Sequence, residues 1–226
     1  MKYTGVIFDF NGVLFFDSDL HETAWNYMSM KYRGKPFSEH ELEENVHGRT
    51  NEDIITFILS GYPQEGVSAL IDEKEGFYRD LCLGDLDRLK LSPGAIELLE
   101  ELNTRNIPKT IATASPKQNL DFFVEHLELK NWFNVDDIVY DNGALPGKPQ
   151  PDIYLAAAKS LGLAPSECIV IEDSNSGIMS AFKAGIGKIY GIGPESQKEK
   201  LSNMDAVDKV ITQLNEISLL ELKDYS

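Results

Sequence analysis

The stretch TGVIFDFNGVLFFDS, residues 4–18, decides the fold and the chemistry that we expect of this chain. Its apolar run Val6–Phe8 predicts a buried β-strand that ends at the carboxylate of Asp9. Asn11 and Gly12 follow before the chain becomes apolar again. The sequence therefore puts a carboxylate at the carboxyl end of the first strand, with an amide two residues later.

Strands and helices alternate from about residue 90 onward. Ser92-Pro93 and Ser115-Pro116 each combine a helix N-cap residue with proline at the first helical position. Short apolar strands separate the helices, which predicts an α/β fold: a Rossmann-like, doubly wound parallel sheet covered on both faces. The expected strands are Ile107–Thr113, Ile138–Tyr140, Cys168–Ile171, Ile189–Ile192 and Val207–Ile211, and the expected helices carry Ala95–Leu102, Leu120–Leu127, Pro151–Leu161 and Ile178–Phe182, with a last one near Leu222.

Residues 18–83 have a different, all-helical pattern. Ser38 and Glu41 form a capping-box pattern, and apolar residues recur at helical spacing as far as Leu81, which predicts roughly four helices. We expect an α/β core of residues 1–15 and 87–226 and an inserted helical cap of residues 16–86. A helical insert beside a ligand site is a candidate lid, with hinges expected at Phe15–Asp17 and Gly84–Arg88.

Residues able to do chemistry gather where the predicted strands end. Asp9, Thr113 and the pair Glu172-Asp173 lie at or just past such ends, and Lys148 lies in a loop before a helix. In open α/β sheets, ligands bind beyond the carboxyl ends of the strands. We therefore expect one crevice to collect all of these residues.

The order of these motifs resembles the haloacid dehalogenase superfamily of aspartate-nucleophile phosphotransferases. The insert is similar to the helical C1-type cap of the β-phosphoglucomutase-like subgroup, and the resemblance covers nearly the whole chain. The motifs that carry it are D9-F-N-G-V-L14, T113-A-S115, K148-P149 and E172-D-S-N-S-G177, with H21-E-T-A-W25 and G48-R49 in the insert.

The resemblance implies that Asp9 is a nucleophile beside a Mg²⁺ ion. A divalent cation removes the repulsion between a carboxylate and a phosphate ester, and Mg²⁺ prefers hard oxygen ligands. By family analogy the ligands are Asp9, the backbone carbonyl of Asn11 and Asp173, with Glu172 bound directly or through water. Successive strand residues point to opposite faces, so Glu172 and Asp173 can share the ion only if the chain turns there.

The resemblance also implies a set of phosphate-binding groups. Thr113 and Ser115 precede a predicted helix N-terminus, whose free N–H groups attract anions, and Lys148 would neutralise the charge on Asp9 and the phosphate. Lys117 follows this turn, with a plain surface position on the helix as the alternative. In the insert, Arg49, His21 and Lys74 are substrate-binding candidates, and a solvated arginine, a structural histidine and a structural lysine are the alternatives.

Asn11 departs from the family pattern, because family phosphatases and mutases carry a second aspartate at this position. An amide does not titrate near neutral pH, and general acid–base catalysis is typically worth about 10²- to 10⁴-fold in rate. Four explanations stay open: a slow phosphatase, replacement of the acid by Asp17 or His21, an engineered substitution that traps a complex, or a protein that binds a phosphorylated ligand without turnover. A mutase would suffer most, and the acidic pair Glu172-Asp173 argues against dehalogenation.

Composition limits the partners. The chain has 226 residues and a formal net charge of −16, which disfavours nucleic acids and anionic membranes. No window is long and apolar enough for a membrane span, and the first ten residues lack a signal-peptide pattern. Cys82 and Cys168 form no metal or redox motif. We expect a cytoplasmic phosphatase, a monomer or weak dimer, that acts on a small phosphorylated substrate such as a sugar phosphate.

Overall fold

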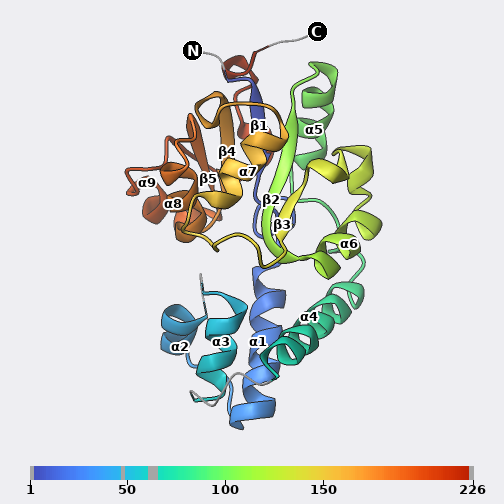
Figure 1. The fold of residues 1–226 in the computed structure, drawn as a ribbon, viewed down its shortest axis with the longest axis vertical. Coiled ribbons are helices and arrows are strands. Elements are labelled where there is room, and N and C mark those ends of the chain that lie inside the picture. Colours follow the sequence, from blue (N-terminus) through green and yellow to red (C-terminus); the bar gives the residue numbers. More distant parts are fainter. Residues whose placement is uncertain (1–2, 47–48, 61–65, 224–226) are drawn as a thin grey trace. The chain divides into compact units, whose positions relative to one another are not determined.

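The computed structural model describes residues 3–46, 49–60 and 66–223, apart from the side chain of Glu43 (Figure 1). The chain divides into two compact units. Met1–Phe16 with Lys90–Ser226 forms one, here called the α/β unit, and Asp17–Leu89 forms the other, the helical unit. The sequence analysis predicts nearly the same boundaries, with residues 1–15 and 87–226 in one unit and residues 16–86 in the other. That the first unit is a catalytic core and the second a cap stays a prediction.

A six-stranded sheet forms the centre of the α/β unit, with strand order β3-β2-β1-β4-β5-β6. Every neighbouring pair of strands is parallel, as the alternation of strands and helices predicts. The strands are β1 (Gly5–Phe8), β2 (Lys109–Pro116), β3 (Val139–Asp141), β4 (Cys168–Glu172), β5 (Lys188–Ile192) and β6 (Lys209–Ile211).

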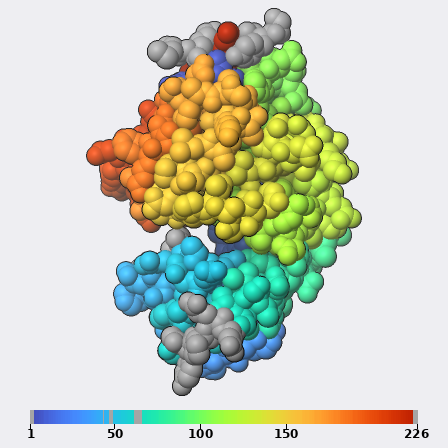
Figure 2. All heavy atoms as spheres, viewed as in Figure 1, coloured from blue at the N-terminus to red at the C-terminus, as the bar shows by residue number. Residues whose placement is uncertain are grey.

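Helices cover both faces of this sheet, and its central strands β1 and β4 are buried along their whole length. Ile7 and Val170 point toward one face, where they pack in a core with side chains of α7, α8 and α9. Phe8 contacts Phe133 on the opposite face, as the alternation of strand side chains requires. In Figure 2 the yellow-to-orange segment, which carries β3, the next loop and α7, occupies the middle of the visible face of this unit. The helices are α5 (Ala95–Thr104), α6 (Lys117–His126), α7 (Asp152–Ser160), α8 (Asn175–Lys183) and α9 (Lys198–Ser202).

The direction of winding reverses between β1 and β4. The chain leaves β1 for β2 and β3 on one side, then returns to build β4, β5 and β6 on the other. Phe8 lies opposite Ile171 in the register, and the Asp9 N–H continues the ladder with a 3.0 Å hydrogen bond to the Ile171 carbonyl. Such a switch point is where doubly wound sheets bind ligands, and Asp9 lies at its carboxyl edge.

Two predicted helix caps are wrong. Ser92 lies ahead of the turn that precedes α5, and Gly94, at φ 79°, takes the N-cap position. Ser92 is buried instead, where its hydroxyl donates to the Val13 carbonyl at 2.6 Å. Ser115 belongs to β2, which runs one residue further to Pro116. In both cases long-range hydrogen bonding competes with the local capping preference.

The predicted C-terminal helix near Leu222 is also wrong. After β6 the described chain forms only two short 3₁₀ turns, η5 (Leu214–Glu216) and η6 (Leu219–Glu221). Leu222 bridges to Tyr3, and the Lys223 N–H donates to the Tyr3 carbonyl at 2.7 Å. Backbone pairing with the N-terminal segment replaces helical hydrogen bonds there.

The helical unit has its own apolar core. The Ser38 and Glu41 capping box is confirmed at the start of α2, and Trp25 is buried in the core that α1, α2 and α3 share. In the part of the chain described, none of the helices combines the length and apolar character that crossing a membrane needs. The helices of this unit are α1 (Ser18–Arg33), α2 (Glu39–Asn45), α3 (Asn51–Ile58) and α4 (Val67–Leu83).

Candidate active site

Asp9 and Lys148 form the centre of the candidate site in the α/β unit. Asp9 is 6% exposed, and its Oδ1 accepts a 2.6 Å hydrogen bond from Lys148 Nζ. Burial raises the pKa of Asp9 to about 7, against the lowering effect of the Lys148 ammonium. Burial would lower the pKa of Lys148, but the carboxylates of Asp9 and Glu172 raise it above its usual value. Lys148 is therefore a charged ammonium held against the predicted nucleophile.

Glu172, the last residue of β4, is fully buried and accepts five hydrogen bonds. Its Oε1 accepts from Lys148 Nζ at 2.6 Å and from the Tyr154 hydroxyl at 2.9 Å. Its Oε2 accepts from the N–H groups of Asp173 and Ser174, both at 2.9 Å, and from the Ser174 hydroxyl at 3.0 Å. Burial would raise the pKa of Glu172, but Lys148 and these donors lower it below its usual value. The ionised carboxylate thus ties Lys148 to the end of β4.

Three carboxylates meet at this edge of the sheet. One oxygen each of Asp9, Glu172 and Asp173 lies within 4.8 Å of the others. This hard oxygen set fits Mg²⁺, which prefers carboxylate, carbonyl and water ligands. Both Glu172 oxygens already accept hydrogen bonds, so Glu172 suits contact with an ion through water. The expected turn after β4 is present and lets Glu172 and Asp173 face the same site.

Two glycines make room for these carboxylates. Gly12 has φ 79°, and a Cβ there would lie 2.6 Å from the Asp173 Cγ. Gly177, in the first turn of α8, lies so close to Glu172 that a Cβ would overlap its carboxyl group. Ser174 caps α8 by accepting from the Gly177 N–H at 3.0 Å. The E172-D-S-N-S-G177 motif therefore ends β4, caps α8 with Ser174 and leaves space beside Gly177 for the Glu172 carboxylate.

Asn11 contacts the hydroxyl groups of Thr113 and Ser115, the two residues that the sequence analysis predicts to bind phosphate. Its Oδ1 accepts from the Ser115 hydroxyl at 2.7 Å and from the Thr113 hydroxyl at 3.4 Å. The Ser115 N–H in turn donates to Thr113 Oγ1 at 3.0 Å. Thr113 and Ser115 are both buried, so their hydrogen bonds matter energetically. A phosphate that uses these donors must share or replace their hydrogen bonds to Asn11.

Lys117 takes a different direction. It is the first residue of α6, and its ammonium pairs with Asp121 one turn along the same helix. Its side chain is 52% exposed. This geometry matches the alternative of a helix-surface lysine better than that of a phosphate ligand.

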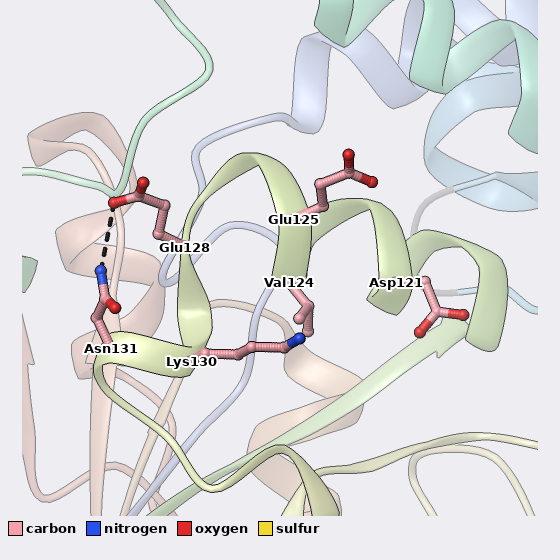
Figure 3. Close-up of a pocket in the computed structure, with 6 residues that line it drawn as sticks. All are labelled: Asp121, Val124, Glu125, Glu128, Lys130 and Asn131. Carbon is pink, nitrogen blue, oxygen red and sulfur yellow. Dashed lines mark hydrogen bonds between the residues drawn. The ribbon is translucent and has the colours of Figure 1, made fainter.

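A pocket of about 510 Å³ lies on α6 and the 3₁₀ turn η1 (Leu129–Asn131), and none of Asp9, Lys148, Glu172 and Asp173 lines it (Figure 3). Three of its six lining side chains are carboxylates, which would repel an anionic substrate. The pocket therefore offers no phosphate site. Its lining residues are Asp121, Val124, Glu125, Glu128, Lys130 and Asn131.

His21 and Lys74 contact each other inside the helical unit. Lys74 is 1% exposed, and its Nζ lies 2.8 Å from His21 Nδ1 and 3.0 Å from Glu75 Oε1. The ammonium also lies 4.9 Å from the centre of the Trp25 ring. Burial lowers the pKa of Lys74, against the opposing effect of Glu75. Both residues thus have structural partners, and their contact with a substrate stays a prediction.

The other candidates of the helical unit are placed as follows. Asp17 is fully buried, accepts a hydrogen bond from the Tyr78 hydroxyl and lies 3.3 Å from His21 Nε2. As a replacement acid it would have to leave these partners, which disfavours that explanation for Asn11. Arg49 is exposed, and its Nε donates to the Glu44 carbonyl at 3.2 Å. Gly48, the other residue of the G48-R49 motif, lies outside the described residues.

Tyr154 is a site residue that the sequence analysis missed, and it offers little local signal. It lies on the buried face of α7 among Ile153, Ala157 and Ala158, where a tyrosine resembles any core aromatic. The one cue is its polar tip in an otherwise apolar stripe, since a buried hydroxyl needs a partner.

Comparison with known proteins shows the family of this chain. Residues 3–185 match the family described as haloacid dehalogenase-like hydrolase. A phosphorylated carbohydrates phosphatase of Thermotoga maritima is 30% identical over 83% of this chain and 84% of its own. A β-phosphoglucomutase of Bacillus subtilis is 29% identical over 95% of this chain and 91% of its own. The crystal structure of a family IA, variant 3 hydrolase from Entamoeba histolytica matches 98% of this chain and 97% of its own, with 41% identity and a TM-score of 0.90. The resemblance to this superfamily and subgroup, and the expected fold class, are confirmed.

Proposed function

Because this chain belongs to the haloacid dehalogenase-like hydrolases, we propose that it is a Mg²⁺-dependent phosphohydrolase of small phosphorylated metabolites. One observation carries the proposal: Asp9, 2.6 Å from Lys148 Nζ, shares the end of the sheet with the carboxylates of Glu172 and Asp173. A buried ammonium and an acidic cation site on either side of one carboxylate suit attack on a phosphate ester.

In the proposed mechanism, an Asp9 carboxylate oxygen attacks the phosphorus and the ester P–O bond breaks. Asp9 and Asp173 would hold Mg²⁺, which would supply charge neutralisation between the carboxylate and the phosphate. Lys148 neutralises charge on Asp9 and the phosphoryl oxygens, and Thr113 and Ser115 donate hydrogen bonds to those oxygens. Water then attacks the phosphorus of the aspartyl phosphate, which releases phosphate and restores Asp9.

Asn11 limits the rate of this cycle. Its amide can orient a leaving oxygen or a water by hydrogen bonding, but it cannot supply or accept the proton. Solvent must then supply the proton that the leaving oxygen takes up and accept the proton that the attacking water loses. Esters with good leaving groups therefore react faster than esters whose leaving group is an alkoxide. Hydrolysis of the aspartyl phosphate suffers as well, because the attacking water has no base. We therefore favour a slow phosphatase over a phosphosugar mutase.

Sugar phosphates are the proposed substrate class. The relatives named above include a phosphatase of phosphorylated carbohydrates and a β-phosphoglucomutase. In the proposal the helical unit acts as the cap that selects the substrate, with Arg49, His21 and Lys74 as its candidate contacts. A monomer or weak dimer in the cytoplasm completes the prediction.

A phosphatase screen with a panel of sugar phosphates, with and without Mg²⁺, tests the proposal. We expect slow, Mg²⁺-dependent phosphate release that Asp9→Asn abolishes. Asn11→Asp should raise kcat by about 10²- to 10⁴-fold, the usual worth of general acid–base catalysis. Turnover that survives Asp9→Asn would refute the site assignment. Fast native turnover that Asn11→Asp does not raise would refute the role given to Asn11.

Asn11 itself favours one second candidate, a phosphometabolite-binding protein without turnover. Tight Mg²⁺-dependent binding of a sugar phosphate, with no phosphate release by the native chain or by Asn11→Asp, would support it. Chloride release from a 2-haloacid without Mg²⁺ would instead indicate dehalogenation.

A further inference from the structure

Tyr154 lies directly beneath the Lys148–Glu172 pair. It belongs to the first turn of α7 and is fully buried. Its hydroxyl donates a 2.9 Å hydrogen bond to Glu172 Oε1, the same oxygen that accepts from Lys148. Its ring also lies 5.1 Å from the Lys148 ammonium. One side chain therefore contacts both members of the pair.

Packing alone does not account for the Tyr154 hydroxyl. The ring is part of an apolar cluster that includes Ile153 and Ala157, where phenylalanine would fill the same space without burying a polar group. The hydroxyl instead gives Glu172 Oε1 a second, immobile donor. With that donor the oxygen has a defined position, and the ring face beneath Lys148 favours a charged ammonium there.

We propose that Tyr154 is a positioning residue that acts through Glu172 and holds Lys148 Nζ against Asp9. This inference rests on the proposed function, in which Lys148 neutralises charge at Asp9. Tyr154 takes no part in bond making. It keeps the ammonium from moving toward solvent as charge on the substrate changes.

The chain contains a matched control in Tyr190 of β5. Tyr190 is also fully buried, its hydroxyl donates at 2.9 Å to Glu221 Oε2, and its ring lies 5.2 Å from the Lys188 ammonium. Lys188 in turn pairs with Glu221 at 2.6 Å. Removing either tyrosine hydroxyl is the same chemical change to a Lys–Glu pair, although the Glu221 side chain is 32% exposed and Glu172 is buried. Tyr154 contacts residues of the candidate site, and the partners of Tyr190 lie outside that site.

Kinetics with p-nitrophenyl phosphate and Mg²⁺ provide the first test. Tyr154→Phe should lower kcat about tenfold, because a small misplacement of a group that stabilises the transition state slows the reaction. KM should change less than twofold, and Tyr190→Phe should leave both constants at their native values. In a Lys148→Met background, Tyr154→Phe should have no further effect, since the residue through which it acts is gone. An unchanged kcat, or an equal loss in Tyr190→Phe, would overturn the inference.

Chemical labelling provides a test that does not depend on activity. Lys148 is 9% exposed, so acetic anhydride should modify it slowly in the native protein, as measured by mass spectrometry of its peptide. Tyr154→Phe should speed this modification at least threefold, and Tyr190→Phe should not. Unchanged labelling of Lys148 would overturn the positioning role. Faster labelling in a protein whose native form hydrolyses no phosphate ester would leave the positioning role standing and refute the proposed function alone.

Discussion

Gly177→Ala is the substitution that tests the geometry of the site most directly. A Cβ at residue 177 would overlap the carboxyl group of Glu172, which sits over the first turn of α8. The five hydrogen bonds that hold this buried carboxylate leave it no second position of equal energy. We therefore expect the added methyl group to displace Glu172 and, with it, Lys148.

The expected loss of stability follows from two opposing effects. Separating a buried ionic group from its partner costs about 3–5 kcal/mol. Alanine in place of a helical glycine returns up to about 1 kcal/mol through its better helix propensity. The net cost is about 2–4 kcal/mol, which at this chain length lowers the melting temperature by roughly 5–15 °C.

Thermal unfolding followed by circular dichroism measures this effect, with Gly76→Ala as the matched control. Gly76 is also helical, in α4, but the nearest atom to its added Cβ would be Arg79 Nη2 at 3.9 Å, an ordinary contact. Gly76→Ala should therefore stabilise the protein by about 0.5–1 kcal/mol. A Gly177→Ala protein that melts at or above the native temperature would refute the arrangement described around Glu172.

Three further predictions concern the metal site and the helical unit. Mg²⁺ affinity, measured by calorimetry, should fall about tenfold per pH unit below pH 7 and level off above pH 7. The reason is that burial raises the pKa of Asp9 to about 7, so the ion must displace a proton from Asp9 at lower pH. Constant affinity from pH 5 to 8 would contradict this prediction. Gly12→Ala should weaken Mg²⁺ binding by roughly tenfold or more, because alanine is strained at positive φ and its Cβ would clash with the Asp173 carboxyl group. Native Mg²⁺ affinity in this variant would argue against the close contact between residue 12 and Asp173. Lys74→Met should lower the free energy of unfolding, measured by urea denaturation, by about 3–5 kcal/mol, because it removes the ammonium that pairs with buried Glu75. A loss under about 1 kcal/mol would show that this ion pair contributes little to stability.

Much of the fold could be predicted because its signals are local. The run Val6–Phe8, the strand Cys168–Ile171 and the capping box at Ser38 each lie within a few residues, where spacing and backbone preference act directly. The failures have a common physical cause. Ser115 has the residue type of a helix cap, yet strand pairing extends β2 past it, and pairing with Tyr3 replaces the helix expected near Leu222. Tertiary hydrogen bonds overrode local preference at both places.

The site divides in the same way. The sequence by itself determined which residue types end the strands: a nucleophile candidate at Asp9, an amide at Asn11 and an acidic pair at residues 172–173. Only the tertiary structure decided how they are used. In the folded chain Lys148 donates a hydrogen bond to Asp9, both oxygens of Glu172 accept hydrogen bonds, and the Tyr154 hydroxyl donates to Glu172. Residues far apart in sequence meet here because a parallel sheet brings the carboxyl ends of all its strands to one edge.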